Sequence, residues 1–327
     1  MYTKDDIRGL CVMAPTPSVE GGEHWSVENS VDLEESARMT EILIRDGSGS
    51  IALCGTTGEN PALLWEEKLA FVDACLAANR GRVPIFAGAT ALGTKETIRQ
   101  MRIFRDHGVE GVFVGLPLWQ TPTPENSVQW FADLSEAVPD MAIMVYSNSM
   151  FFKSSFPLEF WQGVVKNAPT VITNKIASPA ITENLTAIVK AAGHQIAFLP
   201  HERDIAGAIK AYEEAGSKLQ GFWSSNAAGM GPEPLVAWWR AYQSGNQQRI
   251  DEIAKAVQSV PPPLPMDKFP EDFPKYNAQI NKFCAEKAGY IKVRGIRSPY
   301  RDLPEAYRKM CIAHAEGWVA MRKKYAK

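Results

Sequence analysis

The chain has 327 residues, of which 45% are hydrophobic and 22% are charged, and its formal net charge at pH 7 is −2. This composition is typical of an ordinary globular protein that can bury a large core, either as one large barrel or as two modest domains. The nearly balanced charge disfavours nucleic acid or an anionic membrane as a partner, because only the short run Arg322–Lys324 is strongly basic.

The N-terminal residues Met1–Asp6 are polar and acidic, whereas a secretory signal needs a basic start and an apolar run. No later apolar run is long enough to span a bilayer, so we expect a cytoplasmic protein. The five cysteines are scattered and contain no C-x-x-C pair, which predicts neither a disulfide framework nor a zinc site. We therefore expect buried thiols and no metal.

From residue 8 to about residue 243, short apolar runs alternate with amphipathic segments. Eight runs are typical of buried strands, namely Leu10–Ala14, Ser50–Cys54, Pro84–Gly88, Gly111–Gly115, Met141–Tyr146, Thr170–Lys175, Ile196–Pro200 and Leu219–Ser224. Eight helices are predicted to follow them, namely Val31–Arg45, Leu64–Ala78, Thr94–His107, Pro124–Ala137, Leu158–Val165, Ile181–Ala192, Asp204–Glu214 and Glu233–Tyr242.

Two recurrent joints, Asp46–Gly49 and Asp106–Gly111, each combine a glycine helix stop with the start of a strand. Alternating strand–helix units predict an α/β fold with a parallel sheet, and eight of them most simply close into a (β/α)8 TIM barrel. An open, doubly wound sheet is the alternative.

After residue 243 the pattern is helical, with segments at Asn246–Val260, Tyr276–Ala288 and Pro304–Tyr325 and a proline-rich tract at Pro261–Pro265. No strand candidate occurs in this part. The sequence therefore predicts a barrel over residues 1–243 and a C-terminal helical region over residues 244–327. The short linker favours a helical region packed on the barrel over a separate domain.

The run Pro169–Ser178 is rich in β-branched residues and delivers Lys175 at the end of the sixth predicted strand. Burying an unpaired ammonium is costly, so either the side chain reaches solvent or its pKa falls. In the second case the neutral amine becomes a nucleophile of the kind that forms Schiff bases. Taken alone, a lysine near a strand end is more often a solvated charge.

In a TIM barrel, chemistry takes place at the carboxyl ends of the strands. The segment Gly55–Asn60 follows the second strand, and its glycines with Thr56 and Thr57 offer N–H groups and hydroxyls to a small anion such as a carboxylate. A tight strand-to-helix turn is the alternative interpretation. Tyr146 ends the fifth strand, where a tyrosine usually serves packing, but it is also placed to meet Lys175 and to shuttle protons.

Four features together resemble the dihydrodipicolinate synthase / N-acetylneuraminate lyase superfamily of class I pyruvate aldolases: Gly55–Glu59, Tyr146, Lys175 and Gly295–Tyr300. The resemblance covers nearly the whole chain. Within the superfamily the chain is most similar to the aromatic-degradation branch, the trans-o-hydroxybenzylidenepyruvate hydratase-aldolases and their carboxybenzalpyruvate relatives. The supporting stretches are Pro15–Ser18, Leu118–Trp119, Phe198–Glu202, Phe222–Ser225 and Lys275–Asn277.

The resemblance implies that Lys175 forms a Schiff base with the ketone of a 2-oxo acid and that Tyr146 moves protons. It implies that Thr56 and Thr57, in the loop that begins at Gly55, hold the carboxylate. It implies no organic cofactor and no metal, because the protonated imine itself withdraws electrons. It also suggests a homotetramer.

Further candidates have plainer alternatives. Trp223 ends the eighth strand and either stacks on an aryl group or packs in the core. His201 and Glu202 follow the seventh strand, where a polar pair can simply begin the next helix. Asn277 is suggested by the resemblance alone and requires the C-terminal region to fold back over the barrel mouth. Trp119, after the fourth strand, is a candidate for the aromatic lining of that mouth.

Three departures from the superfamily pattern disfavour lysine biosynthesis or leave a loop undefined. Trp119 stands where dihydrodipicolinate synthases have a second tyrosine that is donated across a subunit interface. The arginine that grips a second carboxylate in those enzymes is not apparent in Met150–Ser154. Ser149 replaces the proline that is common after Tyr-x-Asn, which leaves the shape of that loop open.

The sequence therefore predicts a hydratase-aldolase that hydrates and cleaves an aryl-substituted 2-oxobut-3-enoate to an aromatic aldehyde and pyruvate, in the degradation of polycyclic aromatic hydrocarbons. The expected partners are these small molecules. One alternative is an aldolase for sugar acids or aliphatic 2-oxo acids, or an enzyme similar to dihydrodipicolinate synthase. Another is a 2-oxo-acid binding protein without turnover, against which the intact pair of Lys175 and Tyr146 argues.

Overall fold

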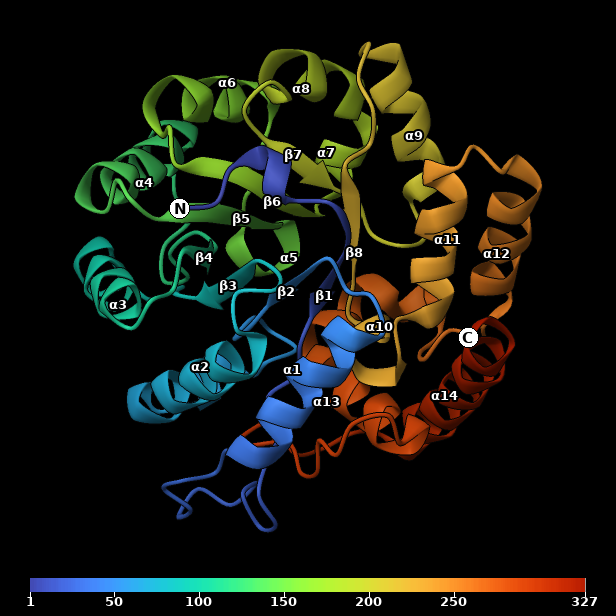
Figure 1. Cartoon of the computed structure of the whole chain (residues 1–327). Coiled ribbons are helices and arrows are strands. Elements are labelled where there is room, and N and C mark those ends of the chain that lie inside the picture. The colour runs from blue at the N-terminus through green and yellow to red at the C-terminus, as the bar shows by residue number, and fades with distance from the viewer. Residues whose placement is uncertain (327) are drawn as a thin grey trace. The chain divides into compact units, whose positions relative to one another are not determined.

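Eight short strands form the sheet of the computed structural model, which describes residues 1–326 (Figure 1). Every strand residue is buried except Ala177, which is partly buried, as expected when both faces of a sheet are covered. The strands are β1 (Gly9–Met13), β2 (Ser50–Ala52), β3 (Ile85–Gly88), β4 (Gly111–Val114), β5 (Ala142–Asn148), β6 (Val171–Ala177), β7 (Ala197–Leu199) and β8 (Gly221–Ser224).

The strands follow the order β7-β6-β5-β4-β3-β2-β1-β8. The neighbouring pairs from β3 to β7 are parallel. A parallel bridge between His201 and Trp223 joins the end of β7 to β8, so the first and last strands of that order are also neighbours. The fold is a TIM barrel, and the open, doubly wound alternative is wrong.

Helices follow the strands in turn. The α-helices are α1 (Leu33–Arg45), α2 (Trp65–Asn79), α3 (Thr94–Asp106), α4 (Pro124–Ala137), α5 (Ser149–Phe152), α6 (Leu158–Asn167), α7 (Pro179–Glu183), α8 (Leu185–Ala192), α9 (Ile205–Glu214), α10 (Asn226–Met230), α11 (Glu233–Gln243), α12 (Gln247–Ser259), α13 (Phe269–Ala288) and α14 (Glu305–Tyr325). Short 3₁₀ helices are η1 (Lys4–Asp6), η2 (Asn60–Ala62) and η3 (Met266–Lys268).

The chain forms two compact units. The first holds residues 1–11 and 84–223, which contain β3 to β7, β8 up to Trp223, and helices α3 to α9. The second holds residues 12–83 and 224–326, in which α1 packs on α2, α11 on α12, and α13 on α10 and α14. The boundary predicted between residues 243 and 244 stays a prediction, and Lys327 lies outside the described residues. Of the described residues after 243, none lies in a strand.

All eight predicted strands are confirmed, with ends that shift by at most two residues. Both β5 and β6 run two residues beyond Tyr146 and Lys175, so these side chains lie just before the strand ends. The predicted helix Tyr276–Ala288 begins earlier, at Phe269. The earlier turns contain Pro274, and a proline in a sequence is typical of a helix boundary. The helix expected at Ile181–Ala192 is divided into α7 and α8 at Asn184.

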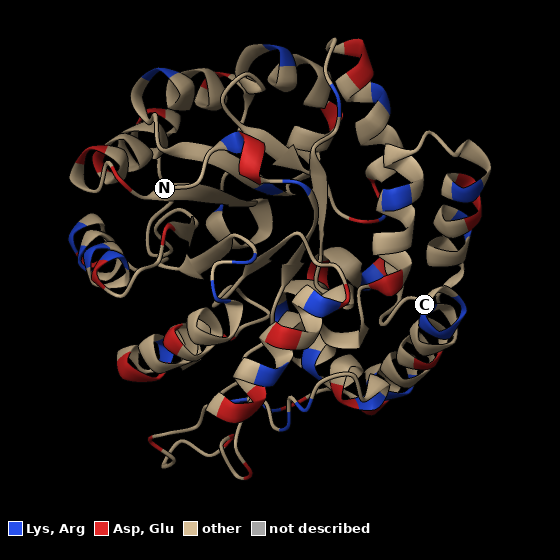
Figure 2. Cartoon of the chain, in the orientation of Figure 1, with Lys and Arg blue, Asp and Glu red and all other residues tan. Residues whose placement is uncertain are grey.

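Acidic and basic side chains share the same helices, as α1 and α12 illustrate (Figure 2). This mixture of signs agrees with the net charge of −2 in the sequence. Within residues 1–326, no helix is both long enough and apolar enough to cross a membrane.

The contact between β1 and β8 depends on a close approach of two glycines. Gly9 donates its N–H to Gln220 O at 2.8 Å, and a Cβ added at Gly221 would lie 2.4 Å from Gly9 O. No side-chain atom there can move aside, because the obstructing atom belongs to the backbone. The absence of a side chain at Gly221 is thus a condition for this strand pair.

We predict that Gly221→Ala lowers the free energy of unfolding by about 1–3 kcal/mol, since overpacking forces the backbones of β1 and β8 apart. Urea denaturation of the purified protein measures the change. Gly207→Ala is the matched control, because a Cβ at this α9 position meets nothing within 4 Å. The control should be neutral or up to about 1 kcal/mol more stable, because alanine favours a helix over glycine. Equal stabilities of the two variants would contradict the prediction.

Candidate active site

Lys175 lies on β6 directly beside Tyr146 of β5, because the two residues are register partners in the parallel pair. Its Nζ lies 4.3 Å from the centroid of the Tyr146 ring and 3.7 Å from the centroid of the Trp223 ring of β8. Only 5% of the residue is exposed. The amine is therefore held between two aromatic faces and is nearly removed from water.

Burial lowers the pKa of Lys175 from 10.5 to about 7. Among the described residues, no carboxylate contributes to this shift. The two ring faces favour the ammonium by about 0.5–2 kcal/mol each, but the loss of hydration outweighs them. At pH 7 about half of the molecules then carry a neutral amine, whereas a lysine with an ordinary pKa would be neutral in fewer than about one in a thousand. A neutral amine is a nucleophile that can attack a carbonyl carbon.

The phenol ring of Tyr146 is fixed by packing on two sides. Phe113 of β4 stacks on it with ring centroids 4.7 Å apart, and Phe152 of α5 meets it edge-on at 5.1 Å. Phe152 fits there because Gly115 has no side chain, since a Cβ at that position would lie 1.9 Å from the Phe152 ring. The phenol is consequently held in one orientation beside Lys175.

Asn148 connects Tyr146 to the loop after β5. Its Nδ2 donates to Tyr146 Oη at 3.2 Å, and its Oδ1 accepts from the backbone N–H groups of Met150 and Phe151 at the start of α5. This side chain therefore caps a short helix that the sequence did not predict and defines the loop that begins at Ser149. The same capping side chain orients the phenol hydroxyl.

Polar side chains next to Lys175 and Tyr146 in the sequence fix the register of β5 on β6. Asn174 Nδ2 donates to Val145 O at 3.0 Å and to Ser147 Oγ at 2.8 Å. Ser147 Oγ in turn donates to Lys175 O at 3.1 Å. Slippage of this pair by one residue would turn Lys175 away from Tyr146, so these bonds protect the site geometry.

Trp223 and His201 form a second wall. Trp223 Nε1 donates to Ile176 O at 2.7 Å, and the His201 ring meets the indole edge-on with centroids 4.6 Å apart. His201 Nδ1 accepts from the backbone N–H of Arg203, so a neutral imidazole carries its proton on Nε2, 3.8 Å from a Glu202 carboxylate oxygen. Burial lowers the pKa of His201, which favours this neutral form.

The predicted carboxylate loop lies in the second compact unit, after β2. The backbone N–H of Glu59 donates to Thr56 O and that of Asn60 to Gly55 O, which closes a tight turn. Thr57 is buried in this turn, while Gly55 and Thr56 are partly exposed. The loop thus has the tight, glycine-containing form that was expected, and its ligand stays a prediction.

Asn277 and Trp119 are two further residues that the sequence predicts for the site. Asn277 lies buried on α13, where its backbone O and Oδ1 accept from Asn281 Nδ2. Trp119 follows β4 and is 79% exposed. Roles for both stay predictions. Within the described residues, no group of three His, Cys, Asp or Glu side chains is arranged to hold a metal ion.

The structure thus brings four predicted residues together, namely Lys175, Tyr146, Trp223 and His201. Sequence reasoning did not assign roles to Asn148 or Phe113. The position of Asn148 two residues after Tyr146 is the one signal that could have identified it, because side chains two apart in a strand share a face.

Residues 25–316 match the Dihydrodipicolinate synthetase family. The chain is 36% identical over 330 residues to a trans-o-hydroxybenzylidenepyruvate hydratase-aldolase of Pseudomonas putida, an alignment that covers 99% of this chain and 97% of the relative. It is 31% identical to a trans-2'-carboxybenzalpyruvate hydratase-aldolase of Nocardioides sp. (strain KP7), with coverage of 99% and 96%.

Among solved structures, the chain is similar to one described as PhdJ bound to substrate intermediate, with a TM-score of 0.93, 29% identity and 99% of each chain covered. A dihydrodipicolinate synthase from Aquifex aeolicus gives a TM-score of 0.76 at 21% identity, with 93% of this chain and 95% of that chain covered, and this likeness shows the fold alone.

The lowered pKa of Lys175 predicts a pH-dependent effect of Lys175→Met on stability. The unfolded chain keeps this proton up to about pH 10.5, whereas the folded chain releases it near pH 7. The cost of burying the ammonium is therefore fully present below pH 7 and declines as the pH rises toward 10.5. The variant should be more stable relative to wild type at pH 6 than at pH 9, by about 2–3 kcal/mol.

Urea denaturation of both proteins at the two pH values measures this difference. Lys190→Met, at an exposed lysine of α8, is the control and should show the same stability change at both pH values. A Lys175→Met effect that does not change between pH 6 and pH 9 would contradict the lowered pKa.

Proposed function

Because the chain belongs to the dihydrodipicolinate synthetase family, we propose that it is a hydratase-aldolase that works through a Schiff base on Lys175. Its substrate is an aryl-substituted 2-oxobut-3-enoate, and its products are an aromatic aldehyde and pyruvate. The full-length likeness to hydratase-aldolases supports the substrate class. The observation that carries the chemistry is the buried amine of Lys175, with its pKa lowered to about 7 between the rings of Tyr146 and Trp223.

The proposed reaction begins when Lys175 Nζ attacks C2 of the substrate and water leaves, which forms an iminium. The iminium withdraws electrons through the conjugated double bond, so water adds at C4. Cleavage of the C3–C4 bond then releases the aldehyde and leaves an enamine, which is protonated at C3 and hydrolysed to pyruvate and free Lys175. Tyr146 carries protons in these steps, held in place by the amide of Asn148.

The loop of Gly55, Thr56 and Thr57 is proposed to bind the substrate carboxylate through backbone N–H groups and hydroxyls. Its place after the carboxyl end of β2 supports this role, because TIM barrels keep their binding groups at that end of the strands. His201 Nε2–H and Asn277 are proposed to bind an ortho hydroxyl or carboxylate on the aryl ring.

Trp223 is proposed to stack on the aryl group. Its indole is already positioned by the hydrogen bond to Ile176 O, so it loses little freedom when a ring binds. A sugar acid would instead need several hydroxyl-matching groups, because an unpaired polar group costs about 1–3 kcal/mol when it is buried. The walls around Lys175 are largely aromatic, which favours an aryl substrate.

We also propose a cytoplasmic homotetramer. All five cysteines are buried and present as thiols, which suits a reducing compartment. Trp119 is 79% exposed in the single chain, and a large exposed ring is suited to an interface between subunits. Light scattering on the purified protein tests the assembly.

The substrate class is tested by a screen of aldehydes with pyruvate in the condensation direction, read by the absorbance of the conjugated product. Aryl aldehydes should be preferred. Trp223→Ala should lower kcat/KM for benzaldehyde-type substrates about two- to tenfold more than for short aliphatic aldehydes, because stacking contributes about 0.5–1.5 kcal/mol. Trp25→Ala, at an exposed tryptophan, is the control. A preference for glyceraldehyde or an open-chain sugar would replace the aryl substrate with a sugar acid.

Tyr146→Phe removes only the phenol hydroxyl and should slow turnover by about 10²–10⁴-fold, the usual range for a positioned acid or base. Incubation with pyruvate and borohydride should still add one pyruvate-derived mass to Lys175, identified by peptide mapping. An adduct on a different lysine would remove Lys175 from its proposed role. An unchanged turnover number would mean that another group moves the protons.

A further inference from the structure

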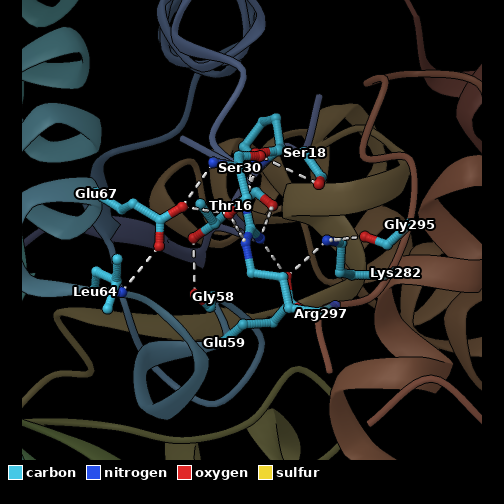
Figure 3. A network of polar contacts seen from close by, with 11 residues as sticks. Thr16, Ser18, Ser30, Gly58, Glu59, Leu64, Glu67, Lys282, Gly295 and Arg297 are labelled. Atoms are coloured by element: carbon cyan, nitrogen blue, oxygen red, sulfur yellow. Dashed lines mark hydrogen bonds and ion pairs between the residues drawn. The ribbon is translucent and has the colours of Figure 1, made fainter. Parts of the chain in front are cut away.

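A second cluster of buried charges lies in the unit formed by residues 12–83 and 224–326, and the reaction described above does not use it (Figure 3). The Glu59 cluster consists of Glu59, Lys282 and Arg297 together with Ser30 and Glu67. All five residues are buried. The cluster contains two carboxylates and two cations, so its formal net charge is zero.

Glu59 is the central acceptor of this cluster. Lys282 Nζ donates to its Oε2 at 2.6 Å, and Arg297 Nη1 donates to the same oxygen at 2.7 Å. The backbone N–H of Arg297 donates to Oε1 at 2.7 Å. Lys282 also donates to Gly295 O at 2.6 Å, so both cations tie the Glu59 carboxylate to the segment 295–297.

The guanidinium of Arg297 uses all of its N–H donors. Besides Glu59, its guanidinium donates to Ser30 Oγ, Ser30 O, Thr16 O and Pro17 O. The guanidinium thus makes five hydrogen bonds, which equals the number of its N–H donors. Glu67 lies beyond Ser30, whose Oγ and N–H donate to the Glu67 carboxylate, and contacts Leu64 N rather than the loop.

Glu59 is also the last residue of the loop that carries Thr56 and Thr57. Its φ of +54° lies in the left-handed region, which a glutamate adopts only when its surroundings hold it there. Thr16 Oγ1 donates to Gly58 O at 2.7 Å, and a Cβ at Gly58 would lie 2.9 Å from Cys54 N. The loop is therefore packed tightly at its backbone and fixed at its far end by the Glu59 side chain.

A buried ion pair of this kind contributes little to net stability, because the loss of hydration largely cancels the attraction between the charges. What such a pair does supply is a defined geometry, since both partners must stay in place to remain satisfied. The cluster links the 55–59 loop to residues more than two hundred positions further along the chain. The cluster therefore constrains the position of the loop that carries Thr56 and Thr57.

We propose that Glu59, Lys282 and Arg297 are positioning residues that hold the Thr56–Thr57 loop ready for the carboxylate of a 2-oxo acid. This inference rests on the proposed role of that loop in carboxylate binding. The three side chains do not touch the substrate; they fix the turn whose N–H groups and hydroxyls do. Weakening the bonds to Glu59 should therefore affect carboxylate recognition and leave the amine chemistry of Lys175 intact.

The test compares two ketones, pyruvate and acetone, in borohydride trapping on Lys175, with labelling measured against ketone concentration. Only pyruvate carries a carboxylate. Glu59→Gln should raise the pyruvate concentration for half-maximal labelling about tenfold, with full labelling at saturation, and should leave the acetone curve unchanged within about twofold. Glu67→Gln is the matched control, because it alters the same cluster without touching the loop, and both curves should stay unchanged.

The double variant Glu59→Gln/Lys282→Met keeps the cluster neutral, because it removes one charge of each sign, and it serves if Glu59→Gln alone fails to fold. It should show the same pyruvate-specific shift. Equal shifts for pyruvate and acetone, or no shift for either, would overturn the positioning role.

Thr57→Val distinguishes carboxylate binding by the loop from the positioning role of the cluster. An unchanged pyruvate curve in Thr57→Val would remove carboxylate binding by the loop itself, whereas a shift in Thr57→Val without one in Glu59→Gln would overturn only the role of the cluster.

Discussion

The loss of hydration at Lys175 is the constraint on which the candidate site depends. An amine on a parallel strand that is buried between two aromatic rings cannot keep an ordinary pKa, because neither ring replaces the water that an ammonium loses. The neutral form of this proposed nucleophile is thus favoured by its surroundings rather than by a neighbouring base. Every contact that keeps water and carboxylates away from this amine also sets its reactivity.

The neighbours of Lys175 can be understood from this constraint. Tyr146 has to lie at the adjacent register position, and the hydrogen bonds of Asn174 and Ser147 keep the two strands in that register. The indole N–H of Trp223, its only polar group, donates to Ile176 O, so the ring presents an apolar face to the amine. Burial of the Lys175 amine lowers the stability of the fold, and the apolar core of the barrel offsets this loss.

Much of the fold could be predicted from the sequence, because buried parallel strands have continuous apolar runs and their helices have clear glycine stops. The pairing of Lys175 with Tyr146 followed from strand order alone. The roles of Asn148 and Gly115 could not be predicted, because each depends on a contact that only the folded loop creates. The link between Glu59 and Arg297 spans 238 positions, and no local pattern carries such information.

Lys175 and Lys282 show why residue type and burial together do not identify a nucleophile. Both amines are buried, and burial lowers the pKa of Lys282 to about 8 even though Glu59 opposes the change. Lys282 Nζ is held by Glu59 Oε2 and Gly295 O, and loss of its proton would leave the carboxylate with one cation fewer. Lys175 has ring faces in place of such acceptors, so its neutral form leaves no buried anion unpaired. The two lysines differ in their partners, and this difference supports the proposed chemistry of Lys175 and the proposed positioning role of Lys282.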